Sequence, residues 1–140
     1  VLGGGFNYKF VKELPEVAQY MMDTNMWFDP TNPKALALKK RVEAKGDLFT
    51  FEVYLAYGSV KLLADALERA RSADKEKLIA ALESSTWSDH LMPYGPTKFV
   101  NGQNQGGRPV ILQASTSDIE VVWPNQFASA KPIFPKPKLG

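Results

Sequence analysis

The sequence predicts an α/β fold, and three features of the chain support this prediction. Val1-Leu2 has the character of the end of a buried strand, and Gly3-Gly4-Gly5 directly after it permits a tight turn with positive φ. A long apolar pattern of helical period occupies residues 51–71. Near the C-terminus, two short β-type segments at residues 109–114 and 119–123 predict a hairpin.

The first strand also bears on the extent of the protein. A buried strand such as Val1-Leu2 needs neighbours on both sides, and the remaining sequence offers few candidates. We therefore expect this chain to be the C-terminal part of a larger α/β protein, with a function that belongs to the whole.

The segment after the glycines predicts one short helix and one strand. Residues 7–14 can form a helix that ends before Pro15, because a residue that precedes proline avoids the helical conformation. Residues 17–22 are mostly apolar and predict a strand. Residues 23–32 predict an irregular connection that contains Trp27.

Cap residues mark the beginnings of two further helices. Asn32 is a favourable N-cap with Pro33 at the first helical position, and Gly46 suits the glycine that ends such a helix. Asp74 caps a later helix that ends near Ser84.

The helix predicted over residues 51–71 is the strongest element of the sequence. Its apolar residues form two stripes at helical spacing, with Val53, Tyr57, Val60, Ala64 and Leu67 in one stripe and Leu55, Leu62 and Ala66 in the other. Two stripes predict burial over most of the helix circumference, between a sheet on one side and helices on the other.

Short strands and turns are predicted in the last part of the chain. Residues 97–100 predict a strand that the turn pair Asn101-Gly102 closes. The hairpin described above turns at residues 115–118. The tail, residues 131–138, carries three prolines and predicts an extended, polyproline-like conformation.

Composition excludes several classes of site. The 140 residues include 17 basic and 15 acidic side chains, and this net charge of +2 does not support nucleic-acid binding. The absence of cysteine excludes disulfides, thiolate metal sites and cysteine nucleophiles. No apolar run approaches the roughly 18 residues that a membrane-spanning helix needs.

The polar residues form no recognisable catalytic pattern. Gly3-Gly4-Gly5 lacks the Lys-Ser/Thr pair of a phosphate loop and the G-x-G-x-x-G spacing, so a tight turn is its expected role. His90 is the only histidine, which makes a catalytic triad or a His-rich metal site hard to build, and a local hydrogen bond is its expected role. We therefore expect no catalytic residue, no metal and no cofactor.

Aromatic residues gather at the start of the long predicted helix. Core packing is the favoured role of Phe49 and Tyr57, whereas Tyr54 lies off the main stripe and suits core packing and ligand contact equally. Trp27 and Phe28 are expected to anchor their irregular segment to the body of the protein, with a hinge or cleft rim as the alternative.

The order of these elements and several residue runs resemble part of a known family. The runs are Tyr54-Leu-Ala-Tyr-Gly-Ser-Val-Lys-Leu-Leu-Ala-Asp-Ala-Leu-Glu-Arg-Ala, Gly95-Pro-Thr-Lys-Phe and Asn101-Gly-Gln-Asn, which follow the helix that begins at Asn32-Pro33. Together they resemble the C-terminal part of the periplasmic branched-chain amino-acid-binding proteins, the substrate-binding components of ABC importers. The resemblance covers nearly the whole chain.

The resemblance implies the C-terminal portion of a two-lobed type I periplasmic-binding-protein fold, in which hinge closure traps the ligand. In this layout residues 1–30 belong to the second lobe, residues 31–104 belong to the first, and residues 105–140 return to the second lobe. The implied mechanism is reversible binding and not catalysis. The implied partners are a small-molecule ligand, a membrane permease, and the missing N-terminal part or a second copy of the fragment, and the implied location is periplasmic or extracellular.

The resemblance also implies ligand-binding residues at two places. Members that bind amino acids carry an acidic residue just after the strand matched by Val1-Leu2, whereas this chain has Gly4 or Gly5 there. This departure makes aromatic acids or other small carboxylates an alternative to amino acids. Tyr54 matches an aromatic residue that lines the family's cleft. The candidate ligand-binding residues are Tyr54, Phe51, Gly4, Gly5 and Phe6.

Two other classes of function stay open. One is a fragment of an α/β enzyme, which the single histidine, the lack of cysteine and the absence of a G-x-S-x-G elbow disfavour. The other is a self-associating interaction domain that dimerises through apolar surface. An activity screen separates the enzyme from the binding protein, and a measurement of molecular mass detects the dimer.

Overall fold

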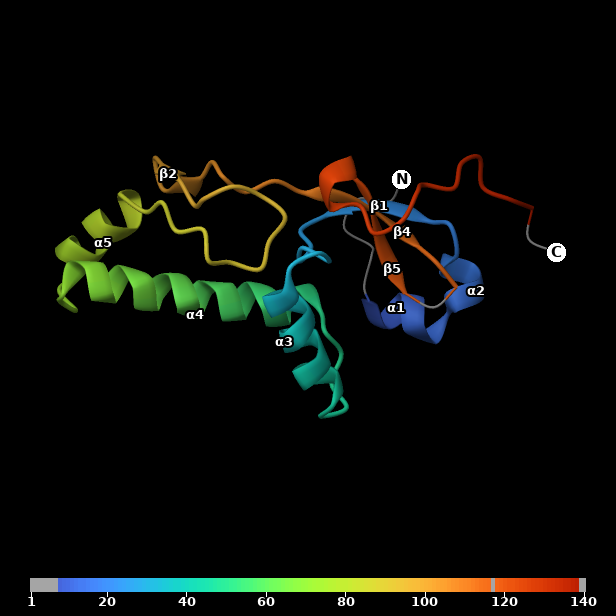
Figure 1. Cartoon of the computed structure of the whole chain (residues 1–140), viewed down its shortest axis with the longest axis horizontal. Helices are drawn as coiled ribbons and strands as arrows, with labels where there is room; N and C mark the ends of the chain where they lie inside the picture. Colours follow the sequence, from blue (N-terminus) through green and yellow to red (C-terminus); the bar gives the residue numbers. More distant parts are fainter. Residues whose placement is uncertain (1–7, 117, 139–140) are drawn as a thin grey trace.

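The described part of the chain forms two units with two connections between them. The computed structural model describes residues 8–116 and 118–138, so the predicted first strand, the glycine turn and Phe6 lie outside the described residues. The sheet unit, residues 8–25 with the described residues of 110–138, lies to the right in Figure 1, and the helical unit, residues 33–104, lies at the left and centre. Residues 26–32 and 105–109 form the two crossovers between them.

The sheet unit is built on a three-stranded antiparallel sheet of order β1-β4-β5. Its elements are α1 (Tyr8–Glu13), α2 (Pro15–Ala18), β1 (Met22–Asn25), β4 (Val110–Ala114), β5 (Ile119–Trp123) and the short 3-10 helix η1 (Asn125–Phe127). The predicted β4–β5 hairpin is confirmed, and Leu112 lies opposite Val121 in its register. Both of these side chains are fully buried, so the hairpin supplies the centre of the core in this unit.

The prediction of a strand over residues 17–22 is wrong. Residues 15–18 form α2 instead, because the fixed φ of Pro15 suits the first helical position. Tyr20 then adopts a φ of 66° and turns the chain. The strand β1 starts at Met22, where pairing with β4 begins, and therefore extends into the segment predicted to be irregular.

The helical unit contains three helices and a small hairpin. Its elements are α3 (Pro33–Glu43), α4 (Phe51–Ala70), α5 (Lys75–Glu83), β2 (Phe99–Val100) and β3 (Gln103–Asn104). Each well-populated contact between elements lies within one unit: α4 packs on α5 in the helical unit, and β4 packs on β1 and β5 in the sheet unit.

The predicted N-caps of α3 and α5 and the predicted hairpin turn are confirmed. The Asn32 side chain accepts a hydrogen bond from the Lys34 backbone N–H at 2.9 Å, so it caps α3. Asp74 caps α5 in the same way, by accepting from the Lys77 backbone N–H at 3.1 Å. Asn101 and Gly102 have φ of 50° and 74°, the backbone of a tight hairpin turn, and join β2 to β3.

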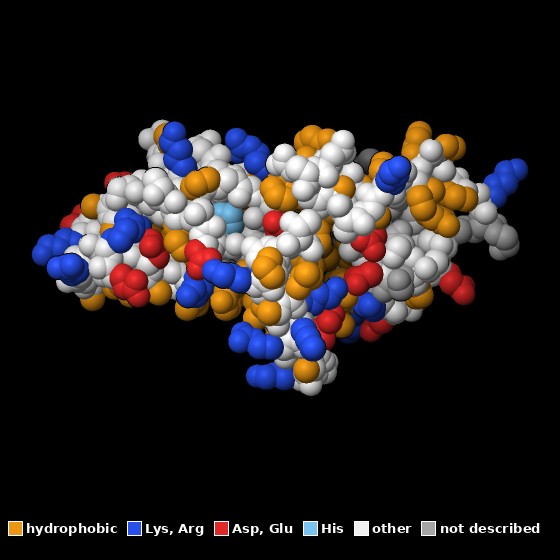
Figure 2. Space-filling view, viewed as in Figure 1, with side chains coloured by type: hydrophobic (Ala, Val, Ile, Leu, Met, Phe, Trp, Pro, Cys, Tyr) orange, Lys and Arg blue, Asp and Glu red, His pale blue; other side chains and the backbone are white. Residues whose placement is uncertain are grey.

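The prediction that α4 is buried over most of its circumference is wrong for the described part of the chain. Tyr54 and Ala66 are the buried residues of this 20-residue helix. The opposite face carries exposed apolar side chains, among them Val60, which is 68% exposed, and Leu63. Figure 2 shows apolar side chains gathered along the lower edge of this helix. We call Tyr57, Val60, Leu63 and Leu67 the open face of α4.

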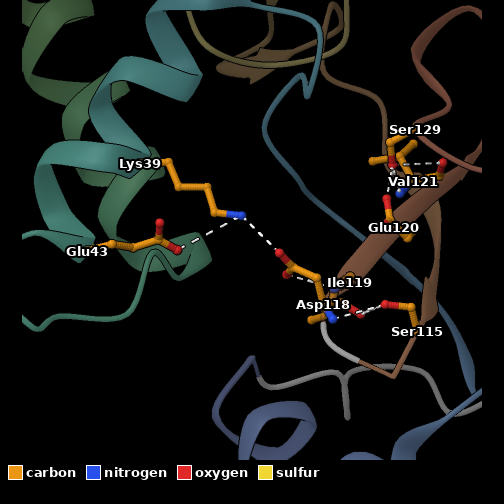
Figure 3. A network of polar contacts seen from close by, with 8 residues as sticks. All are labelled: Lys39, Glu43, Ser115, Asp118, Ile119, Glu120, Val121 and Ser129. Atoms are coloured by element: carbon orange, nitrogen blue, oxygen red, sulfur yellow. Dashed lines mark hydrogen bonds and ion pairs between the residues drawn. The ribbon is translucent and has the colours of Figure 1, made fainter.

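A polar network connects the two units (Figure 3). The Lys39 Nζ atom of α3 lies 3.1 Å from Asp118 Oδ2 in the β4–β5 turn and 4.0 Å from Glu43 Oε1. The Ser115 hydroxyl accepts the Asp118 backbone N–H at 3.0 Å, which holds the turn in place. The ion pair is partly shielded, because the Lys39 and Asp118 side chains are only 21% and 32% exposed.

Candidate functional site

The first crossover passes directly beside the start of α4. Thr50 precedes the helix as its N-cap, and Tyr54 follows in the second turn, where it is 1% exposed. The Tyr54 hydroxyl donates a hydrogen bond to the Met26 carbonyl oxygen at 3.2 Å. The helical unit is thus attached to the crossover by a partly buried hydrogen bond.

Five aromatic rings pack together at this point, and we call them the aromatic cluster. They come from α1, the first crossover, the loop before α4 and α4 itself, and they are Tyr8, Trp27, Phe28, Phe49 and Tyr54. The Tyr54 ring centroid lies 5.9 Å from that of Trp27 and 5.3 Å from that of Phe49. Such separations are favourable for aromatic pairs. The cluster therefore joins both units at the place where the chain passes between them.

The aromatic cluster tests several of the predictions made from the sequence. Trp27 and Phe28 anchor the crossover to the body of the protein, and Phe49 is a core residue, both as predicted. The prediction of core packing for Tyr57 is wrong in the described chain, because this side chain is 38% exposed on the open face of α4.

The candidate ligand-binding residues are only partly brought together. Tyr54 belongs to the core of the aromatic cluster, whereas Phe51, one turn earlier, is 36% exposed. Gly4, Gly5 and Phe6 lie outside the described residues. A role of these five residues in ligand contact stays a prediction.

Burial raises the pKa of two phenols of the aromatic cluster, which are neutral at ordinary pH in any case. Desolvation raises the pKa of Tyr54 far above its ordinary value, and the charge of Glu52 adds to the shift. Burial likewise raises the pKa of Tyr8, with a further contribution from Asp118. The neutral Tyr54 phenol acts as a hydrogen-bond donor.

A cavity of about 150 Å³ lies between α4 and the loop that follows α5. Its wall on the helix side includes Tyr54 and Gly58, and its wall on the loop side includes Trp87, His90 and Tyr94. Burial raises the pKa of the Tyr94 phenol. This cavity could not be predicted from the sequence, because its two walls come from residues 54–62 and 87–104, which are not adjacent in the chain.

His90 has the local role that the sequence predicts. Its Nδ1 atom accepts a hydrogen bond from the Met92 backbone N–H at 3.3 Å, so the proton of the neutral ring is on Nε2, which donates to the Gly95 carbonyl oxygen at 3.0 Å. The partners of both ring nitrogens are backbone groups. His90 therefore shapes its loop and is not paired with a nucleophile or a carboxylate.

A larger groove, of about 610 Å³, lies where the second crossover meets both units. Its lining combines residues 93–95 of the helical unit, residues 105–109 of the crossover and residues from 123–127 of the sheet unit. Tyr94 also lines the 150 Å³ cavity, so this ring separates the two spaces. The groove suits ligand binding by its size, since small-molecule sites occupy about 300–1,000 Å³.

Metal binding and membrane insertion find no support in the described residues. Within residues 8–116 and 118–138, no group of three or more His, Asp or Glu side chains is arranged to hold a metal ion. None of the described helices is long and apolar enough to cross a membrane.

No curated protein matches the chain significantly. Residues 3–118 match the family described as periplasmic binding protein, which confirms the resemblance and the α/β fold inferred from the sequence. This family is one of solute-binding proteins, found in general in the periplasm or outside the cell, and is generally not enzymatic. Because the match spans most of its length, the chain belongs to the periplasmic binding protein family.

Proposed function

We propose that this chain is part of the substrate-binding component of an ABC importer. The component captures a small carboxylate, such as an amino acid or an aromatic acid, between two lobes and delivers it to a permease in the membrane. Membership in the periplasmic binding protein family supports the solute-binding role. It also supports a periplasmic or extracellular location.

The observation that carries the proposal is the double crossover between the sheet unit and the helical unit, which meet at the aromatic cluster. In the proposed layout, residues 31–104 belong to the first lobe, and residues 1–30 and 105–140 belong to the second. These boundaries fall in or beside the crossovers at residues 26–32 and 105–109. A binding protein that closes by a hinge needs two units that are joined by only a few connections.

The ligand contacts in this proposal come from both lobes. Gly4, Gly5 and Phe6 supply the second-lobe side. On the first-lobe side, Phe51 is accessible at the start of α4, and Tyr54 lies behind it with its hydroxyl bound to the Met26 carbonyl. The accessible Phe51 ring offers apolar surface, which suits an aromatic or aliphatic part of the ligand, and the buried Tyr54 supports the start of the helix from the aromatic cluster.

Exchange of Phe51 for alanine tests this assignment in the full-length protein. We expect Phe51→Ala to weaken the binding of the preferred carboxylate about tenfold, which corresponds to about 1.4 kcal/mol. The melting temperature should change little, because Phe51 is partly exposed. Calorimetric titrations with leucine, phenylalanine and benzoate measure the affinity.

The matched control is Phe134→Ala, which removes a ring that is 85% exposed on the C-terminal tail. We expect the control to bind as the unmodified protein does. Equal affinities in both variants would remove Phe51 from the site. Failure of the unmodified protein to bind any of the three carboxylates would contradict the proposed ligand class.

A further inference from the structure

We propose that the 610 Å³ groove at the second crossover binds a planar aromatic carboxylate. We call it the crossover groove, and its residues are those of 93–95, 105–109 and 123–127 that line it. This site is separate from the ligand contacts proposed above at Phe51 and the glycine turn. The inference therefore does not depend on the proposed importer function.

The charge in the groove comes from Arg108. Its Nη1 atom donates to two backbone carbonyl oxygens of its own segment, those of Gln105 at 2.7 Å and Gly107 at 2.8 Å. Among the described residues, no carboxylate forms an ion pair with Arg108. An arginine that is oriented by the backbone and lacks an acidic partner is well suited to bind a carboxylate with its remaining N–H groups.

The apolar part of the groove is aromatic. Tyr94 lines it from the helical unit, and Trp123 and Phe127 line it from the sheet unit. Trp123 is 55% exposed, although large rings of this kind are usually mostly buried. Exposed aromatic surface beside a guanidinium favours a ligand that has a flat ring and a negative charge, because the ring can stack while the charge is neutralised.

The floor of the groove is held rigidly by the backbone around Gly106. The Asn104 side-chain oxygen accepts hydrogen bonds from the Lys98 backbone N–H at 3.1 Å and from the Gly106 backbone N–H at 3.0 Å. A Cβ atom at Gly106 would lie 2.2 Å from the Pro96 carbonyl oxygen, so only glycine permits this close approach. The Arg108 segment is therefore fixed before a ligand arrives, which lowers the entropic cost of binding.

The groove also takes its walls from both units. Tyr94 belongs to the helical unit, Trp123 and Phe127 belong to the sheet unit, and Arg108 lies in the crossover between them. A ligand in the groove thus contacts both units at the connection that orients them.

Ligand-observed fluorine NMR with 4-fluorobenzoate tests this inference on the full chain. We expect saturable binding in the high micromolar to millimolar range, as suits an open groove, and at least fivefold weaker binding of the uncharged analogue 4-fluorobenzyl alcohol. Arg108→Gln and Trp123→Ala should each weaken 4-fluorobenzoate binding at least fivefold. Circular dichroism spectra that match that of the unmodified chain show that both variants are folded.

Two control variants separate this site from other sites. Arg41→Gln removes a charge from α3, which lines a different cavity, and Phe134→Ala removes an exposed ring of the C-terminal tail that does not line the groove; both should bind 4-fluorobenzoate as the unmodified chain does. Binding that is unchanged in both Arg108→Gln and Trp123→Ala would overturn the inference. Equal binding of the acid and the alcohol would also overturn it, since Arg108 would then have no role.

Discussion

The β4–β5 hairpin and helix α4 are both rich in apolar residues, but these residues are buried in the hairpin and largely exposed on one face of α4. In the hairpin, the apolar residues Val110, Leu112, Ile119 and Val121 are buried, and Leu112 and Val121 are completely enclosed. In α4, apolar residues occupy most of the circumference, but only one face is covered. Val60, at the centre of the open face, is 68% exposed.

The difference shows which part of burial follows from the local sequence pattern and which part depends on tertiary contacts. A two-residue alternation places one face of a strand inward, and residues of α1 and α2 such as Tyr8, Val11 and Ala18 belong to the same buried core as Leu112 and Val121. The described chain thus supplies the elements that cover this face of the hairpin. An apolar helix face requires a second element at the right distance, and the described chain supplies α5 and the following loop on one side only. The open face of α4 is therefore surface that a partner could cover, and the rest of the first lobe is the partner that our proposed function implies.

The largest expected effect comes from the one large side chain that α4 buries. Tyr54→Ala removes a ring from the aromatic cluster and a hydrogen bond to Met26, and we expect it to lower the free energy of unfolding by about 3–5 kcal/mol. Tyr57→Ala, three residues later on the open face, should cost less than about 1.5 kcal/mol because that ring is partly in water already. Urea unfolding of the 140-residue chain measures both values, and similar losses would contradict the one-sided packing of α4.

Substitution of one leucine in the hairpin and one in α4 compares the two elements directly. Leu112→Ala in β4 empties a fully buried site and should cost about 2–4 kcal/mol. Leu63→Ala removes the same atoms from the open face of α4, where the side chain is 43% exposed, and should cost below about 1 kcal/mol. Chemical denaturation at low protein concentration gives both numbers. A larger loss at Leu63 than at Leu112 would mean that the open face is covered in solution.

Self-association of the isolated chain tests whether the open face of α4 forms an interface. Exposed apolar patches of this kind favour self-association, so we expect the 140-residue chain to form dimers or larger species. The double variant Val60→Lys with Leu63→Lys places charge at the centre of the face and should shift the chain to monomer. Light scattering measures the mass of both proteins. A monodisperse monomer without the substitutions would rule out the idea.

The smallest expected effect is that of the ion pair between the two units. A double-mutant cycle of Lys39→Gln and Asp118→Asn should give a coupling energy of about 0.5–1 kcal/mol, because both side chains are partly shielded from water. The control cycle uses the i,i+4 pair of Lys9 and Glu13, whose side chains are more than 60% exposed and which should couple by less than about 0.5 kcal/mol. Equal coupling in the two cycles would show that the pair in Figure 3 does not hold the units together.

Much of the candidate site could not be predicted from the sequence. The sequence does indicate a role for the aromatic residues around Tyr54. It also predicts that Trp27 anchors its segment, because a large aromatic side chain in an irregular segment tends to pack on the body of the protein. The exposure of Tyr57 could not be predicted, because an apolar stripe does not show which other element covers it. The crossover groove was also missed, because its walls come from three segments that approach one another only in the folded chain.

The sequence by itself determined the features that depend on neighbouring residues. Asn32 and Asp74 cap α3 and α5 through hydrogen bonds to residues two or three positions away, and Asn101-Gly102 forms its turn because both residues tolerate positive φ. The tertiary structure alone decided the features that depend on distant partners. β1 begins at Met22 because β4 pairs with it there, and α4 keeps an open face because no described element packs on that side. Hydrogen bonds within a few residues are encoded locally, whereas burial depends on which surfaces the complete fold brings into contact.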